Sequence, residues 1–210
     1  MEEKFKSLAV KPGKLEGLLG PARFKPDQKR LRGEVGLVRG LAYTSVGGEV
    51  LDVEVAVTEG SGKLELTGNL GDVMKESARA ALTYIRSRAT QLGVNPQFYK
   101  DCDIHIHFPE GAVPKDGPSA GITVCVALIS ALTARPVRAD IAMTGEISLR
   151  GRVMAIGGLR EKTMAAMRAG VKTVLIPADN EADLAEIDQT VRQGLNFIPT
   201  DHGDKILDIV

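Results

Sequence analysis

Ser119 stands in the short run Gly-Pro-Ser-Ala-Gly at positions 117–121, directly before a long apolar stretch. Proline suits the first position of a helix, because its missing N–H would have no partner there. We therefore expect Ser119 in the first turn of a helix that starts near Pro118. Unpaired backbone N–H groups and the positive end of the helix dipole lie at that turn. Such donors can hold a developing oxyanion, so Ser119 is a candidate nucleophile.

The residue type and its place at a helix start do not show whether Ser119 is catalytic or structural. The run matches G-x-S-x-G, the pattern of a nucleophile elbow, but serine is also common at helix starts for purely structural reasons. The helix that follows is expected over 118–133, and residues 122–132 are almost wholly apolar. An apolar helix of this kind is buried. It would give the serine a rigid support.

Lys162 is the second residue that could do chemistry. It lies in a predicted helix that follows Gly157-Gly158 and ends at Gly170. Positions 162, 165, 166 and 169 fall on one stripe of that helix, so the lysine shares a face with three alanines. A lysine on such a face usually extends its amine to solvent. If the amine is buried instead, its pKa falls and it can serve as a base.

Longer strings connect the two residues. Residues 114–121 closely resemble the nucleophile signature of the Lon family of ATP-dependent serine proteases, and residues 143–151 and 156–162 match further strings of the family. In that family a serine and a lysine 43 positions apart act as a dyad, and Ser119 and Lys162 have the same spacing. The resemblance covers roughly residues 34–210, and its form points to the bacterial, ATPase-fused branch.

The resemblance implies roles for particular residues. Ser119 would be the nucleophile and Lys162 its general base. Backbone N–H groups near Gly117 and Ser119 would hold the oxyanion. Thr144 would hydrogen-bond the lysine. Two carboxylates would lie close to the dyad in supporting or regulatory roles, namely Asp116 and Glu146.

The predicted fold class is α+β, with a mixed sheet, packed helices and a smaller C-terminal α/β part. Alternating apolar residues predict a β-hairpin over 35–57 that turns at Gly47-Gly48, and strands at 63–67 and 103–108. The clearest amphipathic helix is expected over 72–92, with Gly93 as its stop. A strand over 140–147 and a helix around 181–192 are expected in the C-terminal part.

We expect two regions in the chain. Residues 34–210 would be the Lon proteolytic domain, and residues 1–33 would be a remnant of an ATPase module and its linker, with a basic run at 23–32. No phosphate-binding loop of the form G-x-x-x-x-G-K-[ST] occurs in the sequence. We therefore expect no cofactor in this chain, since ATP and Mg would be used by an ATPase module that is absent here.

Composition narrows the possible partners. Lysine plus arginine equals aspartate plus glutamate, 27 each, so no net charge attracts nucleic acid or an anionic membrane. No apolar run reaches membrane-spanning length, and the charged N-terminus lacks the pattern of a signal peptide. A cytoplasmic location fits the two cysteines, which have no metal-binding spacing. His105 and His107 share one strand face, but no further ligand is evident for a metal site.

The resemblance also implies partners. Domains of this family form six-membered rings with the active sites facing an inner chamber, so self-association into a homo-hexamer is expected in the full-length protein. Its substrates would be unfolded polypeptides, threaded in by the ATPase. Contact with nucleic acid through this domain is not expected.

Two alternatives remain open from the sequence. One is a Ser-Asp-His hydrolase that uses Ser119, an aspartate such as Asp179, and His202. Replacing His202 would abolish activity in that enzyme and leave a Ser-Lys dyad intact. The other is a catalytically inactive Lon-like domain that serves as an assembly or nucleic-acid-binding platform. Labelling Ser119 with an acylating inhibitor separates this alternative from an active protease.

Overall fold

The structure is a computed structural model that describes residues 10–21 and 32–208. The predicted basic run at 23–32 lies outside the described residues, apart from Arg32. Within 10–21 the chain forms a 3-10 turn, η1 (Pro12–Lys14), and a short helix, α1 (Leu15–Leu19), neither of which contains a buried residue. The proposed division of the chain at residue 33 stays a prediction.

The remaining elements confirm the α+β class. The strands are β1 (Glu34–Val35), β2 (Leu37–Thr44), β3 (Gly47–Glu59), β4 (Leu64–Thr67), β5 (Cys102–His107), β6 (Pro136–Val137), β7 (Ile141–Met143), β8 (Glu146–Ile147), β9 (Val153–Met154), β10 (Thr173–Pro177) and β11 (Asn196–Thr200). The α-helices are α2 (Asp72–Arg88), α3 (Phe98–Asp101), α4 (Gly121–Thr133), α5 (Leu159–Arg168) and α6 (Gln189–Gly194). The 3-10 turns are η2 (Pro118–Ala120), η3 (Ala178–Asn180), η4 (Ala182–Glu186) and η5 (Gly203–Asp208).

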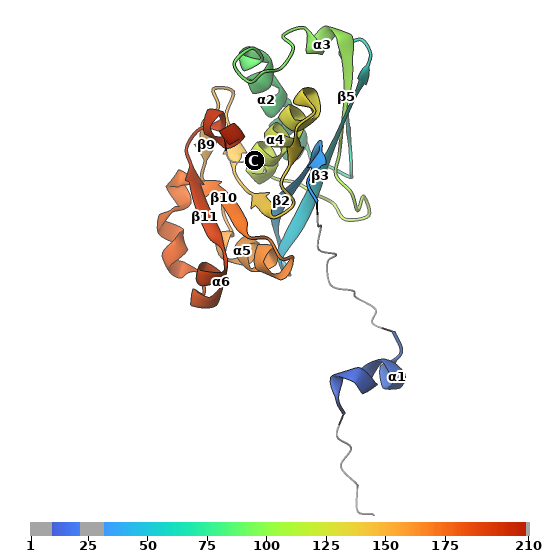
Figure 1. The fold of residues 1–210 in the computed structure, drawn as a ribbon, viewed down its shortest axis with the longest axis vertical. Helices are drawn as coiled ribbons and strands as arrows, with labels where there is room; N and C mark the ends of the chain where they lie inside the picture. Colours follow the sequence, from blue (N-terminus) through green and yellow to red (C-terminus); the bar gives the residue numbers. More distant parts are fainter. Residues whose placement is uncertain (1–9, 22–31, 209–210) are drawn as a thin grey trace, which may run out of the picture.

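One mixed sheet runs through the molecule in the order β11-β10-β7-β2-β3-β5-β4. The pairs β2–β3 and β3–β5 are antiparallel, whereas β2–β7, β7–β10, β10–β11 and β4–β5 are parallel. Helices α5 and α6 connect the parallel strands, as a crossover connection requires. The predicted C-terminal α/β part therefore exists, and it continues the same sheet (Figure 1).

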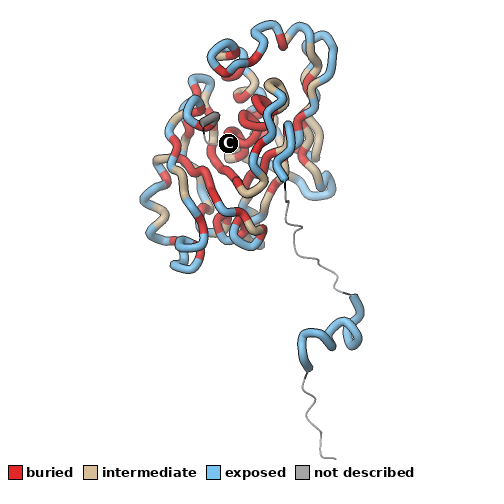
Figure 2. The backbone as a smooth tube through the Cα atoms, in the orientation of Figure 1, coloured by how far each residue is buried: buried red, intermediate tan, exposed pale blue. Residues whose placement is uncertain are grey.

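Helices cover both faces of this sheet. Because alternate strand residues point to opposite faces, strands such as β7 and β10 contribute side chains to two separate cores. In β7, Ile141 and Met143 join the large apolar core with α2 and α4, whereas Ala142 joins a second core with α5 and α6. In β10, Leu175 and Val174 divide in the same way. Figure 2 shows the buried backbone concentrated in α4 and in the strands against it. The helix that follows Ser119 is therefore a core element, as predicted.

The hairpin β2–β3 turns two residues earlier than predicted. Thr44 pairs with Gly47, so Ser45 and Val46 form the turn, and the Thr44 hydroxyl binds the Val46 N–H and the Gly47 carbonyl. Gly48 was predicted in the turn but lies in β3, and glycine is needed there because α5 packs closely against it. A Cβ atom there would lie 1.9 Å from the carbonyl oxygen of Glu161, so glycine permits the close approach of α5 to the sheet.

Helix boundaries differ from the prediction at two further places. Helix α2 ends at Arg88, and a turn leads on to Gly93, whose φ is +69°. The single helix expected over 181–192 is wrong. The chain forms η4, becomes extended at Ile187, and begins α6 after Asp188, whose carboxylate caps the Thr190 N–H. Among residues 10–21 and 32–208, no helix is long and apolar enough to cross a bilayer.

Candidate active site

Ser119 occupies a tight turn ahead of the predicted helix. Residues 118–120 form the 3-10 turn η2, and α4 begins only at Gly121. Gly117 enters the turn with a φ of +110°, a conformation that favours glycine. Ser119 is half-buried, and among the described residues its hydroxyl has no hydrogen-bond partner. The side chain is therefore free to approach a substrate.

Asp116 fastens this turn to the start of α2. Its Oδ1 accepts hydrogen bonds from Met74 N and Gly117 N, each at 2.9 Å. Met74 is in the first turn of α2, where N–H groups have no intrahelical partner, so Asp116 caps that helix from a distant part of the chain. The bonds from Met74 N and Gly117 N lower the pKa of the Asp116 carboxyl. Gly71 makes room for it, since a Cβ there would lie 2.2 Å from the carboxylate carbon.

The nucleophile turn is also held by hydrogen bonds from Gly145 and from Ser77. Gly145 N donates to the Ser119 carbonyl at 2.8 Å, and the Gly145 carbonyl accepts from Ile122 N at 3.0 Å. From α2, the Ser77 hydroxyl donates to the Pro118 carbonyl at 3.3 Å. The backbone around Ser119 is thus fixed between α2 and the segment that leads into β8.

Lys162 is buried, with an exposed fraction of 2%. It lies on α5, and its neighbours on the helical stripe, Ala165, Ala166 and Ala169, are buried with it against the sheet. Burial alone lowers the pKa of the lysine to about 8, from an ordinary value of 10.5. The alanine-lined face therefore has the effect that the sequence predicted.

Thr144 links the lysine to the serine segment. Lys162 Nζ donates to Thr144 Oγ1 at 3.2 Å, and Thr144 Oγ1 donates to the Ser119 carbonyl at 3.4 Å. Thr144 is fully buried and follows β7 directly. Within the described ranges, Thr144 is the one hydrogen-bond partner of the Lys162 amine, and no hydrogen bond joins Lys162 to Ser119 directly. The structure thus brings Ser119, Thr144 and Lys162 together around one threonine hydroxyl.

Glu146 and Gly117 make other contacts. Glu146 is in β8, half-buried and paired with Met154, and in the described part of the chain its carboxylate forms no hydrogen bond or ion pair. The Gly117 N–H, expected near an oxyanion, donates to Asp116. The Ser119 N–H is in the first turn, where helical N–H groups lack a partner within the helix. It is the better-placed donor of the two.

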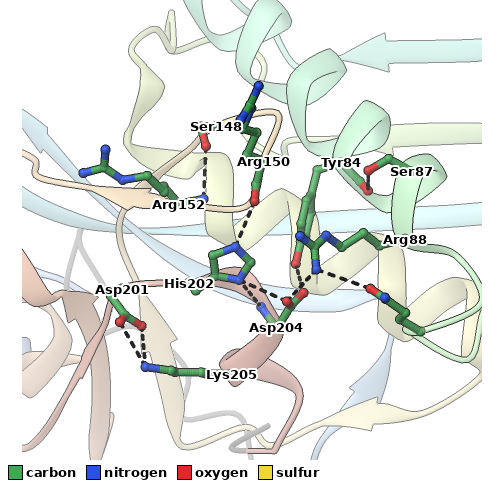
Figure 3. Close-up of polar contacts among 11 residues, drawn as sticks. Tyr84, Ser87, Arg88, Ser148, Arg150, Arg152, Asp201, His202, Asp204 and Lys205 are labelled. Carbon is green, nitrogen blue, oxygen red and sulfur yellow. Dashed lines mark hydrogen bonds and ion pairs between the residues drawn. The ribbon is translucent and has the colours of Figure 1, made fainter.

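The contacts of His202 do not assemble a Ser-Asp-His triad. Its Nε2 binds the Arg150 carbonyl at 2.8 Å, and its Nδ1 lies 3.2 Å from Asp204 Oδ2 (Figure 3). Both ring nitrogens are thus occupied by groups other than Ser119 or Asp179.

His105 and His107 face the same side of β5, as predicted, and both bind the Thr67 hydroxyl, at 2.8 Å and 2.7 Å. Within 10–21 and 32–208, no group of three or more histidine, cysteine, aspartate or glutamate side chains could hold a metal ion. The Thr67 hydroxyl therefore bridges the two imidazoles.

The sequence did not predict the residues that hold the nucleophile turn, among them Gly71, Ser77 and Gly145. Ser77 could have been noticed, because it is a polar residue on the apolar face of α2, between Met74 and Ala78, and it is buried. Gly71 leaves room for the Asp116 carboxylate, and Gly145 acts through backbone hydrogen bonds. A single sequence reveals neither effect.

Comparisons with known proteins agree on one family. Residues 9–210 match the family model described as Lon protease (S16) C-terminal proteolytic domain. The chain is 55% identical over 202 residues to a Lon protease of Brevibacillus choshinensis, covering 96% of this chain and 26% of that protein. It is 53% identical over 206 residues to Lon protease 1 of Bacillus subtilis, covering 98% and 27%. It is 58% identical over 193 residues to a Lon protease of Roseiflexus castenholzii, covering 92% and 24%. The chain thus spans about a quarter of the length of these curated relatives.

Proposed function

The chain belongs to the Lon protease family, by its C-terminal proteolytic domain, and on that premise we propose that it is a serine endopeptidase with a Ser119–Lys162 dyad. The observation that carries the proposal is the buried Lys162 amine, whose pKa burial lowers to about 8. A general base works best when its pKa lies near the operating pH. An ordinary surface lysine, with a pKa of about 10.4, would be almost entirely protonated near neutrality.

In the proposed reaction, neutral Lys162 removes the proton of the Ser119 hydroxyl as that oxygen attacks a peptide carbonyl. The resulting ammonium then protonates the leaving amine, and water hydrolyses the acyl-enzyme in the reverse sequence of proton transfers. Ser-Lys pairs are a variant of the triad arrangement. Thr144 would orient the amine, since its hydroxyl already accepts a hydrogen bond from Lys162 Nζ.

The oxyanion would be held by backbone N–H groups at the nucleophile turn. The Ser119 N–H is the first donor. The Gly117 N–H could join it only when Asp116 Oδ1 releases it, because one N–H cannot donate fully to both oxygens. Asp116 would therefore have a regulatory role in addition to its structural one. We assign Glu146, two residues beyond Thr144, a supporting role beside the dyad.

Labelling of the nucleophile tests this function. We expect a fluorophosphonate, which phosphonylates activated serines with loss of fluoride, to modify Ser119, as mapped by mass spectrometry of a peptide digest. Ser119→Ala should lose both the label and the cleavage of a short fluorogenic peptide, with an unchanged circular dichroism spectrum. Persistent cleavage by Ser119→Ala would contradict the proposal. Absence of labelling in the parent chain would favour the inactive, Lon-like alternative.

For the whole protein, we propose ATP-dependent degradation of unfolded polypeptides by a homo-hexameric ring in the cytoplasm. The names of the relatives support a protease that acts on proteins. Residues 1–33 would connect this domain to an ATPase module that uses ATP and Mg, and residues 34–210 would need no cofactor of their own. A balanced charge of 27 basic and 27 acidic residues gives no support to nucleic-acid binding or to a membrane role.

A further inference from the structure

A polar cluster centred on Asp204 joins three separate parts of the chain. Asp204 Oδ1 accepts a hydrogen bond from the Tyr84 hydroxyl at 2.6 Å, and Asp204 Oδ2 lies 2.8 Å from Arg88 Nη1. Tyr84 and Arg88 belong to α2, whereas Asp204 lies in the C-terminal turn η5. His202 lies between Asp204 and the Arg150 carbonyl, which belongs to the loop between β8 and β9 (Figure 3).

The hydrogen bond from Tyr84 to Asp204 is the strongest interaction of this cluster. The Tyr84 side chain is fully buried, and burial together with the bond to Asp204 raises the pKa of the phenol, so the hydroxyl stays protonated and donates. A short hydrogen bond to a carboxylate is about twice as strong as one between neutral groups. The Arg88–Asp204 ion pair is more exposed, with side-chain exposed fractions of 32% and 43%. Solvent screens it, so it adds less.

The backbone of the C-terminal turn also clamps the β8–β9 loop. Gly203 N donates to the Gly151 carbonyl at 2.7 Å, and Val153 N donates to the Asp201 carbonyl at 2.9 Å. The fit is tight. A Cβ atom at Gly151 would lie 2.5 Å from Tyr84 Cε2, and one at Gly203 would lie 2.8 Å from the Tyr84 hydroxyl. The loop, the C-terminal turn and α2 are therefore packed against one another at a single point.

The two elements joined by Asp204 are the same two that hold the nucleophile turn. Helix α2 contacts the turn through Ser77 and, by way of Asp116, through Met74. The segment leading into β8 contacts it through Gly145, which binds the Ser119 carbonyl. Asp204 thus adds a connection between the two elements that hold the nucleophile turn. Among the described residues it forms no hydrogen bond or ion pair with Ser119 or Lys162.

We propose that Asp204 is a positioning residue for the Ser119–Lys162 dyad, acting by locking α2 to the β8–β9 hairpin. This role rests on the proposed function. With the lock intact, the hairpin keeps Gly145 on the Ser119 carbonyl and Thr144 on the Lys162 amine. With the lock open, the hairpin shifts away from α2, Thr144 moves with it, and water reaches Lys162. The amine then becomes harder to deprotonate, because burial is what lowers its pKa.

The test uses two variants that break the same contact. Tyr84→Phe removes only the donating hydroxyl and preserves the ring that packs against Gly151. Asp204→Ala removes the acceptor for Tyr84 and Arg88 together. Lys205→Gln is the matched control. Its side-chain ion pair with Asp201 is 2.7 Å long and well exposed, and among the described residues the Lys205 amine bonds to neither α2 nor the hairpin.

The readouts are the rate of Ser119 phosphonylation by a fluorophosphonate across pH, the KM for a short peptide, and the melting temperature. We expect Ser119 of both lock variants to be phosphonylated about tenfold more slowly at pH 8, equivalent to about 1.4 kcal/mol of barrier. Their KM should stay within about twofold of the parent value, and the pH midpoint should move upward. Lys205→Gln should match the parent in all three readouts.

A purely structural role would lower the melting temperature and leave the phosphonylation rate and pH midpoint of the folded variants unchanged. That result would overturn the proposal. If Asp204→Ala does not fold, Tyr84→Phe still decides the question, since it deletes one oxygen from a retained ring. Failure of the proposed function would look different, because the parent chain itself would then show no phosphonylation of Ser119.

Discussion

A lysine buried beside three alanines is costly to a folded protein unless its charge is removed. Lys162 is 2% exposed, and among the described residues its amine has one hydrogen-bond partner, the neutral hydroxyl of Thr144. Within the same residues no carboxylate pairs with the amine, so burial shifts its equilibrium toward the neutral form. At the scale of single residues, the same burial that weakens the fold supplies the base.

Replacing Lys162 with methionine should therefore stabilise the domain near neutral pH. The folded pKa is about 8 and the ordinary value is 10.5, which corresponds to about 3 kcal/mol of burial cost when the amine is charged. Loss of the hydrogen bond to Thr144 offsets about 1 kcal/mol of that gain. We expect Lys162→Met to raise the free energy of unfolding by about 2 kcal/mol at pH 7, as measured by urea denaturation.

The sign of the pH dependence provides the control. Because the folded pKa is depressed, the penalty is fully present below about pH 8 and disappears as the pH rises past 10.5. The advantage of Lys162→Met over the parent should accordingly shrink between these two values. An equal advantage at pH 7 and pH 10.5 would mean that burial of charge is not its cause.

Thr144→Val tests the hydroxyl between the dyad partners. Valine keeps the shape of the side chain and removes the acceptor for Lys162 Nζ. A hydrogen bond donated by an ammonium favours the charged form, so its loss should lower the pH midpoint of activity. The maximal rate should fall about tenfold, because the base is no longer oriented. Thr144→Ser, which retains the hydroxyl, should keep both values; an unchanged midpoint in Thr144→Val would count against the contact.

At the scale of elements, the nucleophile turn depends on a helix that is distant in sequence. Gly71→Ala would place a Cβ atom 2.2 Å from the Asp116 carboxylate carbon and displace that side chain from the start of α2. We expect a loss of about 1 kcal/mol in stability, typical of a lost helix cap, and a larger proportional loss of peptidase activity. Thermal denaturation and peptide cleavage measure the two effects.

Gly111→Ala is the control for this change. It lies in the loop that leads to Asp116, its φ is outside the left-handed range, and a Cβ atom there would meet nothing within 4 Å. It should leave both stability and activity unchanged. If Gly71→Ala also proved neutral in activity, the Asp116 contact would have no part in shaping the nucleophile turn.

Periodic patterns in the sequence were sufficient to predict the larger elements. The apolar face of α2, the alternating strand β5 and the buried helix after Ser119 were all confirmed, because each has many residues that follow one repeat. Short elements were predicted less well. The β2–β3 turn is set by the Thr44 hydroxyl, and the break between η4 and α6 is set by the Asp188 cap. Each boundary depends on a single contact, which produces no periodic pattern in the sequence.

For the candidate site, the sequence indicated the dyad residues but not the contacts that position them. Ser119 and Lys162 were identified by a resemblance of strings, and a stripe of alanines indicated the burial of the lysine. The contacts that position the nucleophile turn could not be foreseen, because they join residues distant in sequence, such as Ser77 with Pro118 and Asp116 with Met74. Topology alone brings these pairs together.

At the scale of the whole molecule, residues 34–208 provide the elements of the sheet and both of its cores. The described N-terminal elements η1 and α1 bury none of their residues. Deleting residues 1–30 should therefore change neither the melting temperature nor the cleavage of a short peptide, because exposed segments add little to stability. A large drop in melting temperature would show that this segment packs on the domain.

The most direct test of the central claim is the pH–rate profile of peptide cleavage by the parent chain, Ser119→Ala and Lys162→Arg. The account predicts a single ionisation with a midpoint of about 8 in the parent, and no activity in either variant at any pH. Arginine should remain protonated and so cannot accept the serine proton. Both variants should be folded by circular dichroism. Substantial activity in Lys162→Arg, or a parent midpoint near the histidine value of about 6.5, would contradict the assignment of Lys162 as the base.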